Sequence, residues 1–326
     1  MLASRQNIYF GIITLILLIP YLSGWEMPLG FDAWMLIFSL AITGIPHGAI
    51  DHVIFLQNEK SISKSNNLLQ SFFMPYLLMI GLTFMLWFLI PEIMFWFFLV
   101  VAAYHFGQSQ LYYISWPEKS KSKTILYVFW GIFILSSLWI FHWEQQSRII
   151  KSVFTWNLEI DGFLYQSILF SLFISGIIIV ALLISLFRKK MFSGKMLFQE
   201  ILVLCLLSIL FYYTSPFMAF AIYFGLWHSA RVILTEYYFL KLEKKEKLTI
   251  LSFVKSFLPF SLLSFFGLGI LFWVSQLLQA TISPFMLFLI FISALTMPHA
   301  FFMERMYKFL GSSVKTHQPS PALQKS

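Results

Sequence analysis

The sequence "GIPHGAIDH", residues 44–52, lies inside the long apolar run "AWMLIFSLAITGIPHGAIDHVIFL", residues 33–56. Two histidines and an aspartate therefore occur where the neighbouring residues favour a lipid environment. A polar side chain in the hydrocarbon core is costly, and the ones found there usually belong to a functional site. The run predicts a membrane-crossing helix that carries part of such a site.

The composition of the whole chain is that of an integral membrane protein. Of its 326 residues, 59% are hydrophobic and 11% are charged, with a mean hydropathy of +0.80. Soluble domains carry about 25% charged residues, so this chain has too much apolar surface for one soluble core. The apolar runs are about 20 residues long and do not alternate, which favours helices over barrel strands. The single cysteine, Cys205, excludes an intrachain disulfide and a cysteine-based metal site.

These patterns predict an all-α fold, a polytopic helical bundle of about ten transmembrane helices. The predicted spans are residues 8–24, 32–57, 70–90, 92–115, 124–143, 163–187, 197–213, 215–240, 256–279 and 284–308. Residues 1–310 then form one membrane-embedded domain, followed by a polar tail at 311–326.

The distribution of Lys and Arg predicts the orientation of this bundle. Nineteen of the 22 lie at the two ends of the chain and in alternate loops; the others are Arg148, Lys151 and Arg231. Because cytoplasmic loops are enriched in these residues, both termini and the tail are expected to be cytoplasmic. The same rule explains the net charge of +8 without a nucleic-acid partner. We expect a multi-pass protein of the cell (inner) membrane, with the lipid bilayer as its surroundings.

Four histidines share one predicted depth in the membrane. His47, His105, His228 and His299 lie on spans that run in the same direction, and each is roughly 13–15 residues from the outer end, or about 20–23 Å. Imidazole binds Fe, Zn or Cu, and several imidazoles in a bundle core indicate a metal site. The alternative is that each histidine hydrogen-bonds to a neighbouring helix. His52 is about 140° round a regular helix from His47, so a shared metal would require a local distortion.

Other polar residues lie within reach of this layer. Asp51 follows His47 by one helical turn and is expected to orient an imidazole. Arg231, inside a predicted span, needs an anion, for which Asp51 and Glu304 are the candidates. Aromatic residues near the layer are candidates to line a substrate tunnel, although such residues more often pack helices together. These are Tyr104, Phe106, Phe224, Trp227 and Phe301.

The sequence resembles the Brp/Blh family, the bacterial and archaeal membrane β-carotene 15,15'-dioxygenases. The matching stretches are "GIPHGAIDH", "YHFGQSQ" at 104–110, "YFGLWHSAR" at 223–231 and "MPHAFFMER" at 297–305. The resemblance implies an Fe(II) enzyme that splits the central double bond of β-carotene with O2 to give two all-trans-retinal. It also implies a functional link to a rhodopsin. Candidate catalytic residues are Asp51, Arg231 and Glu304.

The resemblance implies iron ligands at His47, His105 and His228. It also leads us to expect a fourth histidine one turn after His228, where this sequence has Val232. His52, His299 or a water molecule would then complete the site.

Two other classes of function stay open. One is another intramembrane histidine-ligated metal oxygenase, although a di-iron desaturase would need clustered histidine repeats that this chain lacks. An intramembrane zinc protease would need H-E-x-x-H, which is absent. The second is a non-catalytic carotenoid- or retinal-binding protein, or a rhodopsin-assembly protein, which Val232 in place of a histidine leaves open.

Overall fold

The computed structural model describes residues 2–59, 69–114, 116, 120–153, 162–191, 193–243, 248–277, 282 and 284–316. Within these residues the regular structure is helical and no strand occurs, which confirms the all-α prediction. The α-helices are α1 (Leu2–Leu22), α2 (Phe31–Ser39), α3 (Asp51–Glu59), α4 (Met74–Leu89), α5 (Pro91–Leu111), α6 (Lys121–Ile140), α7 (Trp143–Val153), α8 (Gly162–Arg188), α9 (Gly194–Tyr213), α10 (Pro216–Ile222), α11 (Arg231–Glu243), α12 (Ile250–Leu277) and α13 (Pro284–Thr316). Three π-helical segments are η1 (Leu40–Gly44), η2 (Leu69–Phe73) and η3 (Tyr223–Ala230).

Eight helices of the described part of the chain are long and apolar enough to cross a membrane. The membrane prediction is therefore confirmed at the level of class, whereas the count of ten crossings and the cytoplasmic termini stay predictions. Two predicted spans are not among the eight. The span 32–57 is interrupted between η1 and α3, and the polar last turns of α5 lower its mean hydropathy.

The structure differs from the prediction at one additional helix and at one boundary. The polar helix α7 lies between predicted spans and was not predicted. Helix α13 continues to Thr316, so the predicted boundary at residue 310 falls inside a helix. The remaining part of the predicted tail, residues 317–326, lies outside the described residues.

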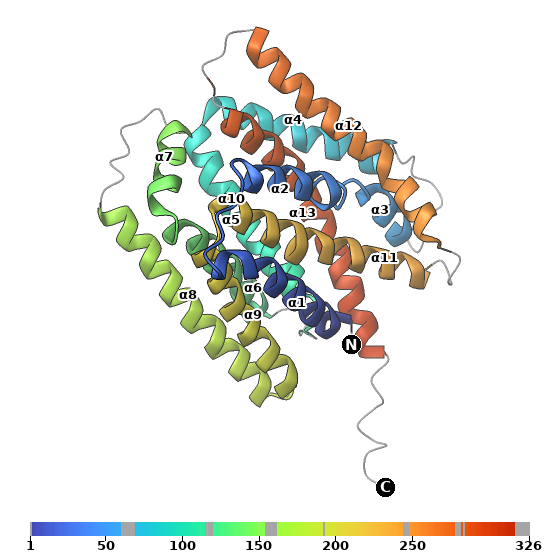
Figure 1. Ribbon diagram of the computed structural model, residues 1–326. Coiled ribbons are helices and arrows are strands. Elements are labelled where there is room, and N and C mark those ends of the chain that lie inside the picture. Colours follow the sequence, from blue (N-terminus) through green and yellow to red (C-terminus); the bar gives the residue numbers. More distant parts are fainter. Residues whose placement is uncertain are drawn as a thin grey trace.

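Figure 1 shows α8 and α9 along one side of the bundle, with α4 and α12 on the opposite side. The helices that carry the histidines of the predicted layer, α5 and α13, and the continuous segment α10–η3–α11 lie between them. Buried aromatic and aliphatic residues of α5, α6, α9 and η3 form the largest apolar cluster. The predicted histidine layer therefore lies against the largest apolar cluster of the described residues.

Glycines allow the helices of this central part to approach very closely. A Cβ atom on Gly107 of α5 would lie 2.0 Å from the carbonyl oxygen of Tyr127, and one on Gly131 of α6 would lie 2.0 Å from that of Ala103. Helices α5 and α6 therefore touch backbone to backbone at two points, as small residues permit in membrane bundles. This crossing fixes the position of α5, which carries His105.

A second close approach joins α2–η1 to α10–η3. A Cβ atom on Gly225 would lie 1.9 Å from Ser39 Oγ. Ser39 donates to the carbonyl of Ala221 at 2.8 Å, and Thr43 donates to that of Gly225 at 3.0 Å. These contacts hold the segment before His47 against the segment that carries His228.

Candidate metal centre

His47 lies on an interruption of its helix. Residues 45–50 form turns between η1 and α3, and Pro46 has no N–H to continue the helical ladder. The helix is therefore interrupted beside His47. His228 lies in η3, a π-helical segment, and such segments are often found at functional sites.

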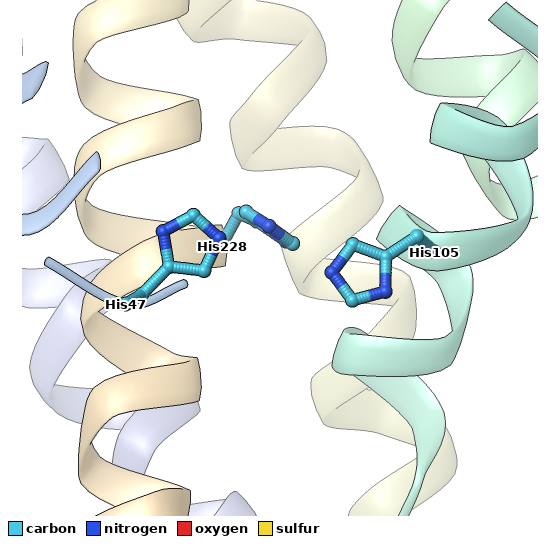
Figure 2. A group of neighbouring side chains, drawn as sticks. All are labelled: His47, His105 and His228. Carbon is cyan, nitrogen blue, oxygen red and sulfur yellow. The ribbon is translucent and has the colours of Figure 1, made fainter. Parts of the chain in front are cut away.

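Three buried histidines converge in the middle of the bundle. Each of His47, His105 and His228 offers one ligand nitrogen, and these atoms all lie within 4.8 Å of one another. Figure 2 shows the rings of His47 and His228 next to each other, with His105 reaching toward them from the opposite helix. The three nitrogens are therefore close enough for one metal ion to bind them after small side-chain movements.

His299 completes a ring of four imidazoles, which we call the histidine ring. The centroid of the His299 imidazole lies 4.8 Å from that of His47 and 5.0 Å from that of His105. His228 lies 5.1 Å from His47 and 5.0 Å from His105. Adjacent planes meet at 78–90°. The prediction that four histidines of equal depth come together therefore agrees with the geometry.

Every member of the histidine ring uses its Nδ1 in a hydrogen bond with the protein. The partners are the Gly44 carbonyl for His47, Gln108 Oε1 at 3.2 Å for His105, Ser109 Oγ at 3.0 Å for His228 and Asp51 Oδ1 at 2.9 Å for His299. All four partner groups accept the hydrogen bond, because the Ser109 hydroxyl donates its proton to the Phe106 carbonyl. A neutral imidazole that donates from Nδ1 keeps its lone pair on Nε2.

Two of those lone pairs have no partner in the described structure. The Nε2 atoms of His105 and His299 are buried and accept no hydrogen bond there. A buried polar atom without a partner is costly, and a bound metal would remove that cost. The nitrogen donors therefore fit a transition metal in the middle of the histidine ring.

A cavity of about 670 Å³ adjoins the histidine ring. All four imidazoles and Asp51 line it, but most of its wall is aromatic and aliphatic. Such a volume is within the range of about 300–1,000 Å³ that is usual for small-molecule sites. Its apolar wall suits a hydrocarbon ligand.

Two of the five aromatic residues predicted to line a substrate tunnel lie in the wall of this cavity. Phe106 and Phe224 line the cavity, whereas Tyr104, Trp227 and Phe301 are not among its lining residues. Trp227 points into the core and donates to Thr14 Oγ1 at 2.9 Å, and Phe301 is 54% exposed on the outside of α13. The sequence analysis missed aromatic residues of α4, η2 and α12, because their side-chain directions depend on helix rotation. These include Phe72, Phe73, Tyr76, Phe84 and Phe260.

Residues 38–307 match the family model described as "Beta-carotene 15,15'-dioxygenase". The chain belongs to this family. The match includes the whole histidine ring, which confirms the resemblance seen in the sequence. No curated protein and no solved structure matches the chain significantly.

Val232, which stands where the family resemblance predicts a histidine, does not line the cavity beside the histidine ring. Val232 is fully buried in an apolar cluster with Ile50, Tyr112 and Met303. His299 occupies the fourth place in the histidine ring. Of the two histidine candidates to replace the missing one, His299 is the one whose ring adjoins those of His47 and His105.

His52 is not part of the histidine ring, so its prediction as a ligand is corrected. Its ring packs at 4.4 Å from that of Phe260, and it also contacts Phe72 and Phe73. His52 still lines the cavity. The break at residues 45–50 rotates α3 relative to η1, but it does not turn both histidines toward the same point.

Asp51 orients an imidazole of a distant helix. Its carboxylate accepts from His299, 248 residues away, and from Tyr76 Oη at 3.0 Å. Counting one turn along a regular helix pointed to His47 instead. The break in the helix is the reason for the difference, because Asp51 begins a new helix.

Arg231 is paired with neither Asp51 nor Glu304, so that expectation was wrong. Its Nη2 donates to Asn7 Oδ1 at 2.6 Å, and Asn7 donates in turn to Glu200 Oε1 at 2.7 Å. All three side chains are buried. The anion that Arg231 reaches through Asn7 is Glu200 of α9. Asn7 and Glu200 are polar residues within otherwise apolar helices, and this sequence signal could have identified them as the partners of Arg231.

Glu304 acts behind the histidine ring and does not line the cavity. It accepts hydrogen bonds from Gln108 and from Tyr104 Oη, the latter at 2.9 Å. Gln108 in turn holds His105. Glu304 therefore orients a ligand through one intermediate side chain.

Proposed function

We propose that the chain is an Fe(II)-dependent enzyme that cleaves the central 15,15' double bond of β-carotene with O2, which yields two all-trans-retinal. The observation that carries this proposal is the histidine ring in the wall of an apolar cavity. Membership of the β-carotene 15,15'-dioxygenase family supports the proposed substrate and the proposed position of the bond.

The chemistry of the donors supports a redox-active metal. Four neutral imidazoles suit Fe, Cu or Zn, but Zn²⁺ has no redox chemistry to offer. The family resemblance favours iron among the others. Bound Fe(II) would supply the activation of O2, and His47, His105, His228 and His299 would hold it.

The remaining work falls to the protein. Asp51, Gln108 and Ser109 fix the rotation of three imidazoles, which keeps each Nε2 directed inward. The apolar wall holds the polyene and excludes water. In the overall reaction the C15=C15' bond breaks and each carbon gains one oxygen atom, so no net proton is taken up or released. The cavity accordingly needs no general acid or base.

The location of the site agrees with the substrate. A carotenoid dissolves in the hydrocarbon core of the bilayer, and His228 and His299 of the histidine ring lie in helices that are long and apolar enough to cross it. The cell (inner) membrane is our proposed location. A functional link to a rhodopsin, which would consume retinal, stays an expectation from the resemblance.

Expression in a β-carotene-producing host tests the proposal. The orange colour should fade, retinal should accumulate, and the purified protein should contain about one iron per chain. His47→Ala and His105→Ala should abolish all three results. Intact β-carotene together with iron-free protein would overturn the proposal. A protein that binds polyene without iron or retinal would instead be a carrier.

A further inference from the structure

The cavity reaches the outside of the molecule between α4 and α12. Leu77 of α4 and Leu263 of α12 both line it, yet they are 59% and 61% exposed. Phe72 and Ala294 line the same cavity and are only 3% and 0% exposed. The exposure of the two leucines therefore comes from the outer surface, and the cavity opens beside them.

This opening is framed by three helices. Phe73, at the end of η2, and Phe260 of α12 lie about one turn before Leu77 and Leu263. Their rings stack with centroids 5.8 Å apart and close one end of the opening. Farther along α12, a Cβ on Gly267 would lie 3.7 Å from the ring of Phe291, which places α13 behind the opening. Figure 1 shows α4 and α12 next to each other on the side of the bundle away from α8.

Helix α12 is the least embedded of the membrane-spanning helices that the structure describes. It has 28 residues, and the buried ones are Phe253, Ser261 and Ser275. The α12 residues that line the cavity beyond Leu263 are small, namely Ser264 and Gly267. Small side chains leave room between α12 and its neighbours.

The depth of the opening indicates what passes through it. Leu77 and Leu263 lie well inside the spans Gln70–Leu89 and Ile250–Leu277, so the opening faces lipid chains rather than water. A water-soluble ligand would not reach it without first entering the hydrocarbon core. The aromatic and aliphatic walls behind it suit a long, thin, apolar molecule.

We propose that the seam between α4 and α12, with Leu77 and Leu263 at its rim, is a lateral portal that admits the carotenoid directly from the bilayer. This inference rests on the proposed function for the identity of the ligand. Leu263 and Leu77 are rim residues rather than catalytic residues. The cavity also has an exposed lining residue at Phe217, near the start of α10, and a route from that end is the competing possibility.

The chain offers matched controls for a blocking experiment. Leu262 is 58% exposed and Leu78 is 73% exposed, and neither lines the cavity. In a Cys205→Ser background, Leu263→Cys and Leu262→Cys are each modified with a bulky maleimide, and Leu77→Cys and Leu78→Cys form a second pair. The holoprotein is placed in phosphatidylcholine vesicles that contain β-carotene, with O2 excluded, and uptake of β-carotene per chain is followed.

Modification at Leu263 or Leu77 should slow uptake about tenfold or more, because a bulky group fills the portal, whereas modification at Leu262 or Leu78 should not. The unmodified cysteine variants should load normally, which shows that they are folded. Equal uptake by the modified pairs would overturn the portal, as would a block caused only by modified Phe217→Cys. Admitting O2 afterwards tests the proposed function separately: a chain that loads through the portal but forms no retinal refutes catalysis alone.

Discussion

At the scale of single residues, each imidazole of the histidine ring depends on a neighbour that holds its Nδ1. The acceptors differ in kind: a backbone carbonyl, an amide, a hydroxyl and a carboxylate. The carboxylate, Asp51, is the strongest acceptor because it carries a charge when ionised. The histidine ring is therefore oriented from four directions, and each direction can be tested on its own.

His299→Ala should remove iron as completely as His47→Ala does, because the two rings are neighbours in the histidine ring, with their centroids 4.8 Å apart. Iron per chain, measured by elemental analysis of purified protein, checks this. The matched control is His52→Ala, which should keep its iron because His52 packs against Phe260 instead. Iron retained by His299→Ala and lost by His52→Ala would reverse our assignment of the fourth ligand.

Gln108→Leu should weaken iron binding by roughly 10–100-fold, the usual effect of losing an outer partner of a metal-bound histidine. The reason is that His105 loses its acceptor and its contact through Gln108 with Glu304. Competition with a chelator measures the change. Gln108→Glu, which keeps an acceptor oxygen, should bind iron more tightly than Gln108→Leu. Equal binding by these two variants would argue against the orienting role.

At the scale of helices, irregular segments place the ligands. His47 lies on a break, and His228 lies on a π-helix. Regular helices carry His105 and His299, and their positions depend on how tightly their helices pack. The crossing of α5 and α6 is therefore as important for the site as the break beside Pro46.

Gly107→Ala should destabilise the protein strongly, because the added Cβ would lie 2.0 Å from the Tyr127 carbonyl and would push α5 away from α6. Overpacking typically costs about 1–3 kcal/mol, and a backbone clash should reach or exceed this range. The thermal unfolding midpoint in detergent measures the loss. Gly81→Ala on α4 is the control, since no atom lies within 4 Å of its added Cβ. A Gly107→Ala protein as stable as the Gly81→Ala protein would contradict the close crossing.

At the scale of the whole molecule, a buried network of polar side chains connects helices that lie away from the cavity. Arg231, Asn7 and Glu200 connect α11, α1 and α9. Gln110, at the end of α5, also donates to Glu200 at 2.9 Å. The network ties the site-bearing helices to the outer ones, one turn beyond His228.

Glu200→Leu should cost about 3–5 kcal/mol of stability, because the buried Arg231 cation is left without an anion. The double variant Glu200→Leu with Arg231→Met should recover much of this loss, since it removes both charges. Denaturation of the wild-type protein, of Glu200→Leu, of Arg231→Met and of the double variant in detergent compares their free energies of unfolding. If the double variant is as unstable as the sum of the single variants, the two charges do not depend on each other.

The sequence by itself determined the membrane class, the family and the common depth of four histidines. Hydropathy is a local property, and depth follows from counting residues at a fixed rise along each helix. Those inferences did not require any knowledge of neighbouring helices. The motifs around His47, His105 and His228 carried the family resemblance in the same local way.

Only the tertiary structure decided which way each side chain points. The break at residues 45–50 directs Asp51 to His299 and leaves His52 against Phe260. Arg231 finds its anion through Asn7, more than 200 residues away. Depth is an axial coordinate that counting supplies, whereas rotation about the helix axis is set by packing between distant segments. The ligand partners, the cavity wall and its opening between α4 and α12 all depend on that rotation.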